Sequence, residues 1–321
     1  MDIDVVIPWV NGNDPVLNAK RARYASGTDA LSFQDVGGST RYADIGEIRW
    51  CVASINRFAP WVRKIYIVTD NQNPGLEPFL DEHFPNGHIP LEIVDHTVIF
   101  RGYEQYLPSF NSSSIETMIW RIPGLSEHYL YLNDDFMLLK PIQPEDFFRP
   151  DGKIIYRGKR QSTLLCRLAV LLKPRKNSRV KVSFKRALLN SMSVAGSYNL
   201  TFLRSSHTPR AQLVSVFEEF YNKHPEAIIR NIEDKFRTTR QFISWQLQFE
   251  LLRKEGRLKV LSDRGYLFYM EPRKKPHYID RKLHKLRTRK FTCACFNSLD
   301  QASKADKERI IALINEKLGL A

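Results

Sequence analysis

The chain has 321 residues, 43% of them hydrophobic, and 49 Lys and Arg residues against 35 Asp and Glu give a formal charge of +14. This composition allows a large core and excludes a chain that is disordered throughout. No apolar stretch approaches the roughly 18 residues of a membrane span, and the first residues lack the order of a secretory signal. We expect a soluble, intracellular protein that attracts polyanions such as nucleotide sugars, phosphate-containing glycans, anionic lipid or nucleic acid.

The first half of the chain alternates short apolar runs with helical patterns. Residues 4–10 are rich in β-branched side chains and stop at turn-forming residues 11–15, which predicts a buried strand followed by a loop. Residues 44–58 place apolar side chains on one helical face, and residues 64–70 predict a second buried strand. Strand, helix and strand in this order predict a parallel βαβ unit.

The same alternation continues to residue 132. Residues 91–96 and 128–132 are predicted strands, with a helix at 112–122 between them. Polar or acidic residues follow the first, second and fourth strands. Because ligands bind outside the carboxyl ends of the strands in open α/β sheets, we expect these residues to meet in one crevice. The predicted fold is α/β, with a Rossmann-like core over residues 1–150.

The composition changes after this core. Residues 153–216 contain no acidic side chain. Two interpretations stay open: a solvated basic face on helices, or contact with an anionic membrane surface or a polyanionic acceptor. We predict a mostly helical, basic subdomain or insertion over residues 151–260, which includes helices at 207–222 and 234–255.

The last segment, residues 261–321, is predicted to return to the core and to end in an amphipathic helix at 304–318. It contains two of the four cysteines, Cys51, Cys166, Cys293 and Cys295. These are too few and too irregularly spaced for a disulfide framework or a zinc knuckle, so we predict reduced, structural thiols.

Asn133, Asp134 and Asp135 directly follow a predicted buried strand. Carboxylate and amide oxygens suit Mg²⁺ or Mn²⁺, which in turn neutralise a diphosphate. An acidic pair alone is a weak signal, since such pairs also cap helices or face solvent. Its place after a strand favours a metal site.

Two other segments have local features of a binding site. Residues 11–14 are either a turn closed by Asx hydrogen bonds or, through Gly12, a place of close backbone approach to a nucleotide; taken alone, the turn is favoured. Asn111 and Ser112 predict the start of a helix. The free amide groups there can be capped by these side chains and can also bind a phosphate.

His207, Arg237 and Arg240 also have two interpretations each. The imidazole is a proton acceptor or a surface or capping group, and the guanidinium groups clamp phosphate oxygens or are ordinary exposed residues. No phosphate-binding P-loop, dinucleotide fingerprint or nucleophile elbow occurs in the sequence. Kinase-like, dinucleotide-dependent and lipase-like functions therefore lose their usual support.

Four blocks of the chain carry a family resemblance: residues 4–14, the long stretch 41–135, residues 207–240 and residues 296–300. Together they resemble the Stealth family, which includes bacterial capsule and exopolysaccharide phosphotransferases and the catalytic subunit of the animal lysosomal-enzyme GlcNAc-1-phosphotransferase. In the last block, relatives carry Asn-Asp where this chain has Asn297-Ser298. This difference leaves Asn297 and Asp300 as the candidates there.

The resemblance implies a reaction and a fold. An intact hexose or N-acetylhexosamine 1-phosphate passes from a UDP-sugar such as UDP-GlcNAc to a sugar hydroxyl, which yields a phosphodiester and UMP. The sheet would be GT-A-like and would bind the nucleotide sugar. The partners would be this donor and a glycan acceptor, with no nucleic acid, in capsule or exopolysaccharide synthesis in the bacterial cytoplasm or at the inner face of the membrane.

The resemblance also implies roles for the candidate residues. Mg²⁺ or Mn²⁺ would bind Asp134, Asp135, Asn297 and Asp300. Catalysis would use His207 to deprotonate the acceptor, and Arg237, Arg49 and Asp135 to neutralise the diphosphate. The donor would contact Asn11, Gly12, Asn13, Asp14, Asp70, Asn111, Ser112 and Arg240. Two alternatives remain: a metal-dependent glycosyltransferase that releases UDP, and a non-catalytic polyanion-binding protein.

Overall fold

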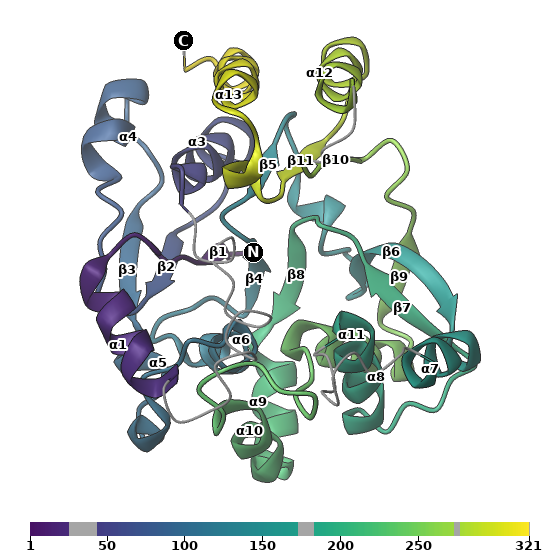
Figure 1. Ribbon diagram of the computed structural model, residues 1–321. Helices are drawn as coiled ribbons and strands as arrows, with labels where there is room; N and C mark the ends of the chain where they lie inside the picture. Colours follow the sequence, from purple (N-terminus) through teal and green to yellow (C-terminus); the bar gives the residue numbers. More distant parts are fainter. Residues whose placement is uncertain (26–43, 173–182, 273–276, 321) are drawn as a thin grey trace.

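A computed structural model describes residues 1–25, 44–172, 183–272 and 277–320 (Figure 1). The main sheet has the order β3 (Leu91–Asp95), β2 (Ile65–Thr69), β1 (Ile3–Pro8), β4 (His128–Tyr131) and β8 (Arg210–Leu213). The first four strands run parallel, and β8 pairs antiparallel with β4. The parallel order 3-2-1-4 is that of a Rossmann-like sheet, which confirms the predicted α/β fold.

The central strands are buried because elements cover both faces of the sheet. β1 and β2 are apolar and buried along nearly their whole length, as parallel strands usually are. Asp4 of β1 is also buried, and its carboxylate accepts hydrogen bonds from Arg63 Nε (2.9 Å), Arg63 Nη2 (2.6 Å) and the Ser126 amide (2.7 Å). These bonds offset the cost of burying the charge.

Helix α3 (Glu47–Phe58) begins three residues after the predicted start at residue 44, because Gly46 at its N-cap has a φ of 96°. Its buried face includes Ile48, Val52 and Ile55, as predicted. On its other side α3 contacts α13 (Lys304–Leu318), whose bounds match the prediction. Trp50 Nε1 donates to Asn315 Oδ1 at 3.0 Å, which links the C-terminal helix to the core.

Two smaller sheets flank the main one. One has the order β10 (Leu267–Met270), β11 (Cys293–Phe296) and β5 (Phe136–Leu138), and the other β7 (Thr201–Ser205), β6 (Ile154–Ser162) and β9 (Leu258–Leu261). β5 starts directly after Asp135 and pairs antiparallel with β11. The C-terminal segment thereby reaches the end of β4. All four cysteines are free and buried, as predicted.

The remaining helices surround these sheets (Figure 1). They are α1 (Pro15–Ala25), α4 (Glu77–His83), α5 (His96–Ile99), α6 (Ser112–Met118), α7 (Thr163–Leu171), α8 (Phe184–Val194), α9 (Val214–Lys223), α10 (Pro225–Ile232), α11 (Ser244–Lys254) and α12 (Tyr278–Thr288). In Figure 1, α12 and α13 lie at one end of the molecule and α9 and α10 at the other. No helix in the described ranges is long and apolar enough to cross a membrane.

The predicted helix at residues 207–222 is wrong in its first half. Residues Arg210–Leu213 are strand β8, and only α9 is helical. The predicted helix at 234–255 begins as late as Ser244, because side chains hold the preceding loop: Asn231 Oδ1 accepts from the Phe242 amide at 2.9 Å. The division of the chain at residues 150 and 260 stays a prediction, and β8 from the middle segment completes the main sheet.

Candidate active site

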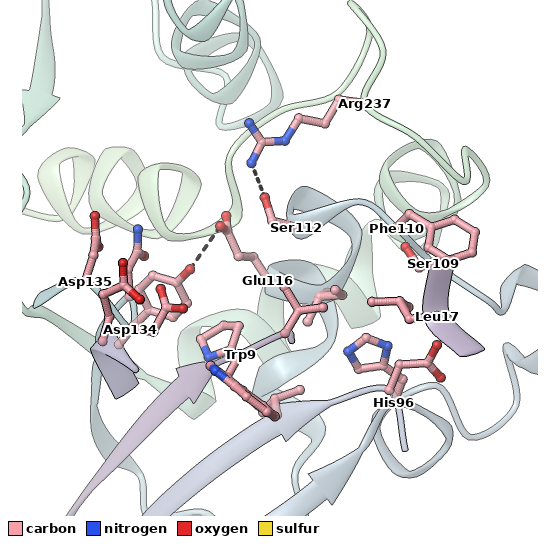
Figure 2. A pocket seen from close by; sticks show the side chains of 18 of the residues that line it. Trp9, Leu17, His96, Ser109, Phe110, Ser112, Glu116, Asp134, Asp135 and Arg237 are labelled. Atoms are coloured by element: carbon pink, nitrogen blue, oxygen red, sulfur yellow. Dashed lines mark hydrogen bonds between the residues drawn. The ribbon is translucent and has the colours of Figure 1, made fainter. Parts of the chain in front are cut away.

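A cavity of about 530 Å³ lies at the carboxyl ends of the parallel strands (Figure 2). This volume falls in the range of small-molecule sites. Residues that follow β1, β2, β3 and β4 line it, together with α6 and the segments around Arg237 and Asn297. The lining includes the side chains of Glu47, Asp70, His96, Phe110, Ser112, Glu116, Tyr131, Asp134, Asp135, Arg237, Asn297 and Asp300. The predicted crevice is therefore present.

Asp134 and Asp135 form the acidic end of the cavity (Figure 2). Asp135 Oδ2 accepts from the Cys295 thiol at 3.3 Å, whereas Oδ1 is buried and has no hydrogen-bond partner in the described residues. Burial raises the pKa of Asp135. The pKa of Asp134 is raised first by burial and then by the charge of Asp135. The two neighbouring carboxyl groups are buried, and the positive charge near them is too small to keep their pKa values in the ordinary range.

Glu47, from the first turn of α3, adds a third carboxyl group to the cavity wall. Burial, with smaller contributions from Asp44 and Asp135, raises its pKa to about 7, although Glu47 Oε2 accepts from the Ile45 amide at 2.8 Å. A bound cation would favour the ionised form of Glu47.

The oxygen donors of Asp134 and Asp135 are of the type found in magnesium sites. In the described residues, no three His, Cys, Asp or Glu side chains converge as a complete protein cage for a metal. Mg²⁺ in such sites is usually held by one or two carboxylates, with waters and substrate phosphates as the other ligands. The partnerless Asp135 Oδ1 and the raised pKa values agree with that arrangement. Asn297 and Asp300 line the same cavity.

The opposite wall comes from α6 and the segment before α11. Ser112 and Glu116 are four residues apart and so lie on one helical face. The Tyr131 hydroxyl donates to Glu116 Oε1 at 3.0 Å, and Arg237 Nη2 donates to the Ser112 hydroxyl. Burial raises the pKa of Glu116, an effect that the positive charges of Arg237 and Arg210 oppose. Arg237 is thus held at the cavity across from the aspartates (Figure 2).

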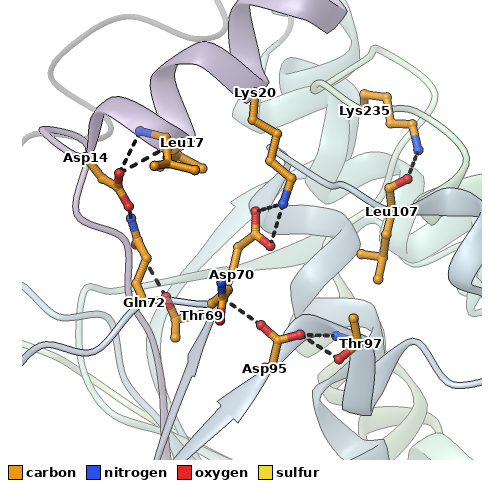
Figure 3. Close-up of polar contacts among 12 residues, drawn as sticks. Asp14, Leu17, Lys20, Thr69, Asp70, Gln72, Asp95, Thr97, Leu107 and Lys235 are labelled. Atoms are coloured by element: carbon orange, nitrogen blue, oxygen red, sulfur yellow. Dashed lines mark hydrogen bonds and ion pairs between the residues drawn. The ribbon is translucent and has the colours of Figure 1, made fainter.

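The predicted donor-binding residues separate into two groups. Asp70 and Ser112 line the cavity, and Asp70 is paired with Lys20 at 2.7 Å. Residues 11–14 do not line it and form the turn that the local sequence favours: Asn11 Oδ1 accepts from the Asn13 amide at 2.9 Å. Gln72 Nε2 bonds to Asp14 Oδ2 at 2.8 Å and ties this turn to the end of β2 (Figure 3).

Asn111 has a structural position beside the cavity. It is fully buried and caps α6, with its side chain accepting from the Ser113 amide at 3.1 Å. It is not among the lining residues. The cap orients the helix that carries Ser112 and Glu116, so the predicted helix start is confirmed, whereas contact of Asn111 with a donor stays a prediction.

Like residues 11–14 and Asn111, the predicted residues Arg49, Arg240 and His207 lie outside the cavity lining. Arg49 is on the exposed side of α3, with its guanidinium carbon 6.0 Å from the Phe79 ring centroid. It follows Glu47 by two residues, which places it on the other side of the helix. Arg240 forms ion pairs of 2.7 Å with both Glu233 and Asp234. The predicted roles of these two arginines at the donor stay predictions.

His207 lies between β7 and β8 rather than at a helix entry. Its ring centroid is 5.0 Å from that of Tyr269 and 6.1 Å from that of Phe136, the residue after Asp135. Burial lowers its pKa to about 4, so the imidazole is neutral at pH 7. The histidine is close to the acidic end, but its role as a base stays a prediction.

Sequence reasoning missed Glu47, Glu116 and His96 as cavity residues. The spacing of Glu116 from Ser112 was the available signal for one of them. His96 follows β3, and burial lowers its pKa to about 4. A buried Arg210 was also missed: its guanidinium carbon is 4.2 Å from the Trp245 ring centroid, and its charge acts on Glu116 and Asp135.

Replacing Glu47 with Gln should stabilise the protein at high pH. The folded-state pKa is about 7 against an ordinary 4.5, so the folded state loses stability as pH rises from 4.5 to 7. Above pH 7, Glu47→Gln should raise the free energy of unfolding by about 1–3 kcal/mol, with little change at pH 4. Urea unfolding at pH 4 and pH 8 measures this. The exposed Glu308→Gln serves as control, and an equal effect of Glu47→Gln at both pH values would contradict the expectation.

The fold and the cavity define an α/β protein with an acidic site at the carboxyl ends of a parallel sheet. Residues 1–29 match Stealth protein CR1, conserved region 1, and residues 41–156 match Stealth protein CR2, conserved region 2. The chain belongs to the Stealth family.

Curated relatives come from several bacteria. The chain is 42% identical over 150 residues to the receptor polysaccharide phosphotransferase WefC of Streptococcus oralis, which covers 47% of this chain and 42% of the relative. It is 36% identical over 236 residues to the exopolysaccharide phosphotransferase SCO6023 of Streptomyces coelicolor, and this alignment covers 74% of this chain and 37% of the relative. It is 31% identical over 258 residues to the capsular polysaccharide phosphotransferase cps1A of Actinobacillus pleuropneumoniae, and this alignment covers 78% of this chain and 66% of the relative. The chain thus spans less than half the length of the first two relatives.

Similar solved structures are distant in sequence. The galactosyltransferase LgtC has a TM-score of 0.49 at 10% identity, over 98% of this chain and 95% of its own. Mouse xyloside xylosyltransferase 1 has a TM-score of 0.40 at 10% identity, over 92% and 98%. The fold assignment rests on the strand order and not on these similarities.

Proposed function

We propose that the chain transfers an intact sugar-1-phosphate, of a hexose or N-acetylhexosamine, from a UDP-sugar to a sugar hydroxyl during capsule or exopolysaccharide synthesis. The products are a phosphodiester and UMP. The names of the three relatives support a polysaccharide phosphotransferase. The observation that carries the proposal is the acidic pair Asp134 and Asp135, which faces Arg237 across one cavity.

The reaction makes and breaks one bond at phosphorus. The acceptor oxygen attacks the phosphorus nearest the sugar, the bond from this phosphorus to the UMP oxygen breaks, and the acceptor proton passes to a base. The bond between the anomeric carbon and its oxygen stays intact. Catalysis of such a transfer is mostly positioning and neutralisation of charge, which is what an acidic metal site and a fixed arginine supply.

The acidic end of the cavity would hold the diphosphate through Mg²⁺ or Mn²⁺. Asp134 and Asp135 would be the protein ligands, with Asn297 and Asp300 as further oxygen ligands from the C-terminal segment. When bound, the ion neutralises the diphosphate charge. Arg237, oriented by its bond to Ser112, adds positive charge from the opposite wall.

The other end of the cavity would hold the nucleoside. His96 and Phe110 line it, away from the aspartates (Figure 2), and the charge of Asp70, a further lining residue, acts on His96. The Asp70 carboxylate, kept in place by Lys20, can accept from ribose hydroxyls. His96 is neutral at pH 7 and can donate from one ring nitrogen, since its Nδ1 is buried without a partner in the described residues.

The nucleotide released by the enzyme tests the proposal against its nearest rival. The protein is incubated with Mg²⁺, a panel of UDP-sugars and a glycan acceptor, and the nucleotide product is identified by chromatography. We expect acceptor-dependent UMP. Release of UDP would indicate a glycosyltransferase with the same site, and binding of polyanions without turnover on any donor would indicate a non-catalytic protein.

Replacing His207 with Ala tests the proposed base. If His207 takes the acceptor proton, kcat should fall about 100-fold or more with little change in the KM for the donor. The exposed His284→Ala is the matched control. An unchanged kcat in His207→Ala would remove this residue from the mechanism.

A further inference from the structure

Helix α7 exposes an apolar face. Its buried positions are Thr163 and Cys166, and the opposite side carries leucines at a spacing that forms one stripe along the helix. The exposed fractions are 66% for Leu164, 67% for Leu165, 42% for Leu168, 77% for Leu171 and 78% for Leu172. An amphipathic helix of a soluble domain normally places polar residues on such a face, so this stripe calls for a partner.

The apolar face extends beyond the helix. The Thr163 amide donates to the Leu200 carbonyl at 2.8 Å, and the Thr163 hydroxyl donates to the Asn199 carbonyl at 2.8 Å. These bonds place Leu200, which is 89% exposed, and the nearby Tyr198, 81% exposed, at the start of α7. We name the set the leucine surface: Leu164, Leu165, Leu168, Leu171, Leu172, Tyr198 and Leu200.

The concentration of apolar side chains here is local. In the described parts of the chain, seven of the twelve large hydrophobic residues with the highest exposure belong to the leucine surface. The others are Met1, Val16, Tyr24, Val98 and Phe184, and Phe184 begins α8, a helix that contacts α7. None of the leucine surface residues lines the cavity.

Unpaired positive charge accompanies the leucine surface. Arg160 is exposed near the end of β6, and Arg167 is exposed on α7 itself, three residues after Leu164 and four before Leu171. Within the described residues, neither arginine forms an ion pair, and neither do Lys185 and Arg186 on α8. The sequence from 153 to 216 has no acidic residue that could supply one. The charge is therefore available to an external anion.

We propose that the leucine surface docks the protein on an anionic lipid bilayer. The leucines enter the boundary between headgroups and acyl chains, and Arg160, Arg167 and Lys185 bind lipid phosphates. This combination of an apolar face with basic flanks is what stabilises interfacial helices on anionic membranes. The proposal is independent of the proposed sugar-phosphate transfer, since the two use separate residues.

A second copy of the chain is a poorer partner for the same surface. A symmetric dimer would place the leucine surface against itself and bring the same basic side chains together. Residues 153–216 contain no carboxylate that could pair with these basic side chains across such an interface. An anionic bilayer satisfies both the apolar and the charged part of the surface.

Vesicle co-sedimentation of the whole chain tests the proposal. Vesicles of phosphatidylcholine alone are compared with vesicles that also contain phosphatidylglycerol, at low and high salt. The apolar variant is Leu165→Ser with Leu171→Ser, and its control is Val16→Ser, an exposed apolar residue on α1. The charge variant is Arg160→Ser with Arg167→Ser, and its control is Arg287→Ser with Arg289→Ser, which removes equal charge from the end of α12.

We expect binding only to the anionic vesicles, weaker at high salt, and reduced by about tenfold or more in both leucine-surface variants. Thermal unfolding and turnover of soluble substrates should stay unchanged, because the replaced side chains are exposed and outside the cavity. Absence of vesicle binding, or equal loss in the arginine control, would overturn the proposal. The proposal would also be overturned if sedimentation equilibrium showed that the unchanged chain is a dimer and that the apolar variant is a monomer.

Discussion

The Asp135→Asn protein should lose about 10³-fold or more in kcat while remaining folded. Asp135 Oδ1 is buried at the cavity wall without a hydrogen-bond partner in the described residues, so this oxygen is available to a ligand in the cavity. The amide keeps the shape of the side chain and can still accept from the Cys295 thiol. What the substitution removes is the negative charge that would hold the metal ion.

The stability of this variant distinguishes a functional from a structural role. Burial raises the pKa of Asp135, which means that the ionised group costs stability at neutral pH. We therefore expect an equal or higher melting temperature for Asp135→Asn at pH 7. Asp151→Asn, at an exposed carboxylate outside the cavity lining, should change neither property. Near-normal turnover by Asp135→Asn would remove the metal site from this position.

The Arg237→Ala protein should lose about 10²–10³-fold in kcat. Arg237 is the cavity residue that faces the aspartates with a positive charge, and its bond to Ser112 fixes the guanidinium in place. Arg237→Lys keeps the charge but loses the planar donor pair, so we expect only partial recovery. Both variants are compared by steady-state kinetics with the same donor and acceptor.

Arg240 provides a matched control for this effect. It lies three residues later, and its guanidinium is occupied by Glu233 and Asp234 outside the cavity lining. Arg240→Ala should therefore change kcat by less than about threefold. Equal losses in the two alanine variants would show that Arg237 acts through the structure of this loop rather than on the substrate.

Elements with a clear local pattern of apolar residues were predicted well from the sequence. β1 and β2 are continuous apolar runs, because both faces of a parallel strand are buried. The bounds of α13 were predicted from its amphipathic pattern, and Ser303 and Gly319 cap its two ends. Residues Arg210–Leu213 were mistaken for helix because four residues are too few to separate the period of a strand from that of a helix.

The part of the site that has a local sequence signal was also predicted. Asp70, Asp134 and Asp135 follow strands, and the rule for open sheets brings such residues to one edge. The local sequence does not tell which side of α3 faces the cavity, and the structure places Glu47 there and Arg49 outside.

The C-terminal wall of the site depends on pairing between distant segments. Asn297 reaches the cavity because β11 pairs with β5, and the Phe296 amide donates to the Asp135 carbonyl at 3.1 Å. No local pattern predicts this contact. The family resemblance alone pointed to residues 296–300, of which Asn297, Ser298 and Asp300 line the cavity.

The mass of the glycan product distinguishes transfer of a sugar phosphate from transfer of a sugar. The acceptor is incubated with the UDP-sugar that supports the fastest turnover, and the purified product is analysed by mass spectrometry and by ³¹P NMR. We expect the acceptor to gain one sugar and one phosphate and to show a phosphodiester resonance. A product that gains the sugar without phosphorus would contradict it.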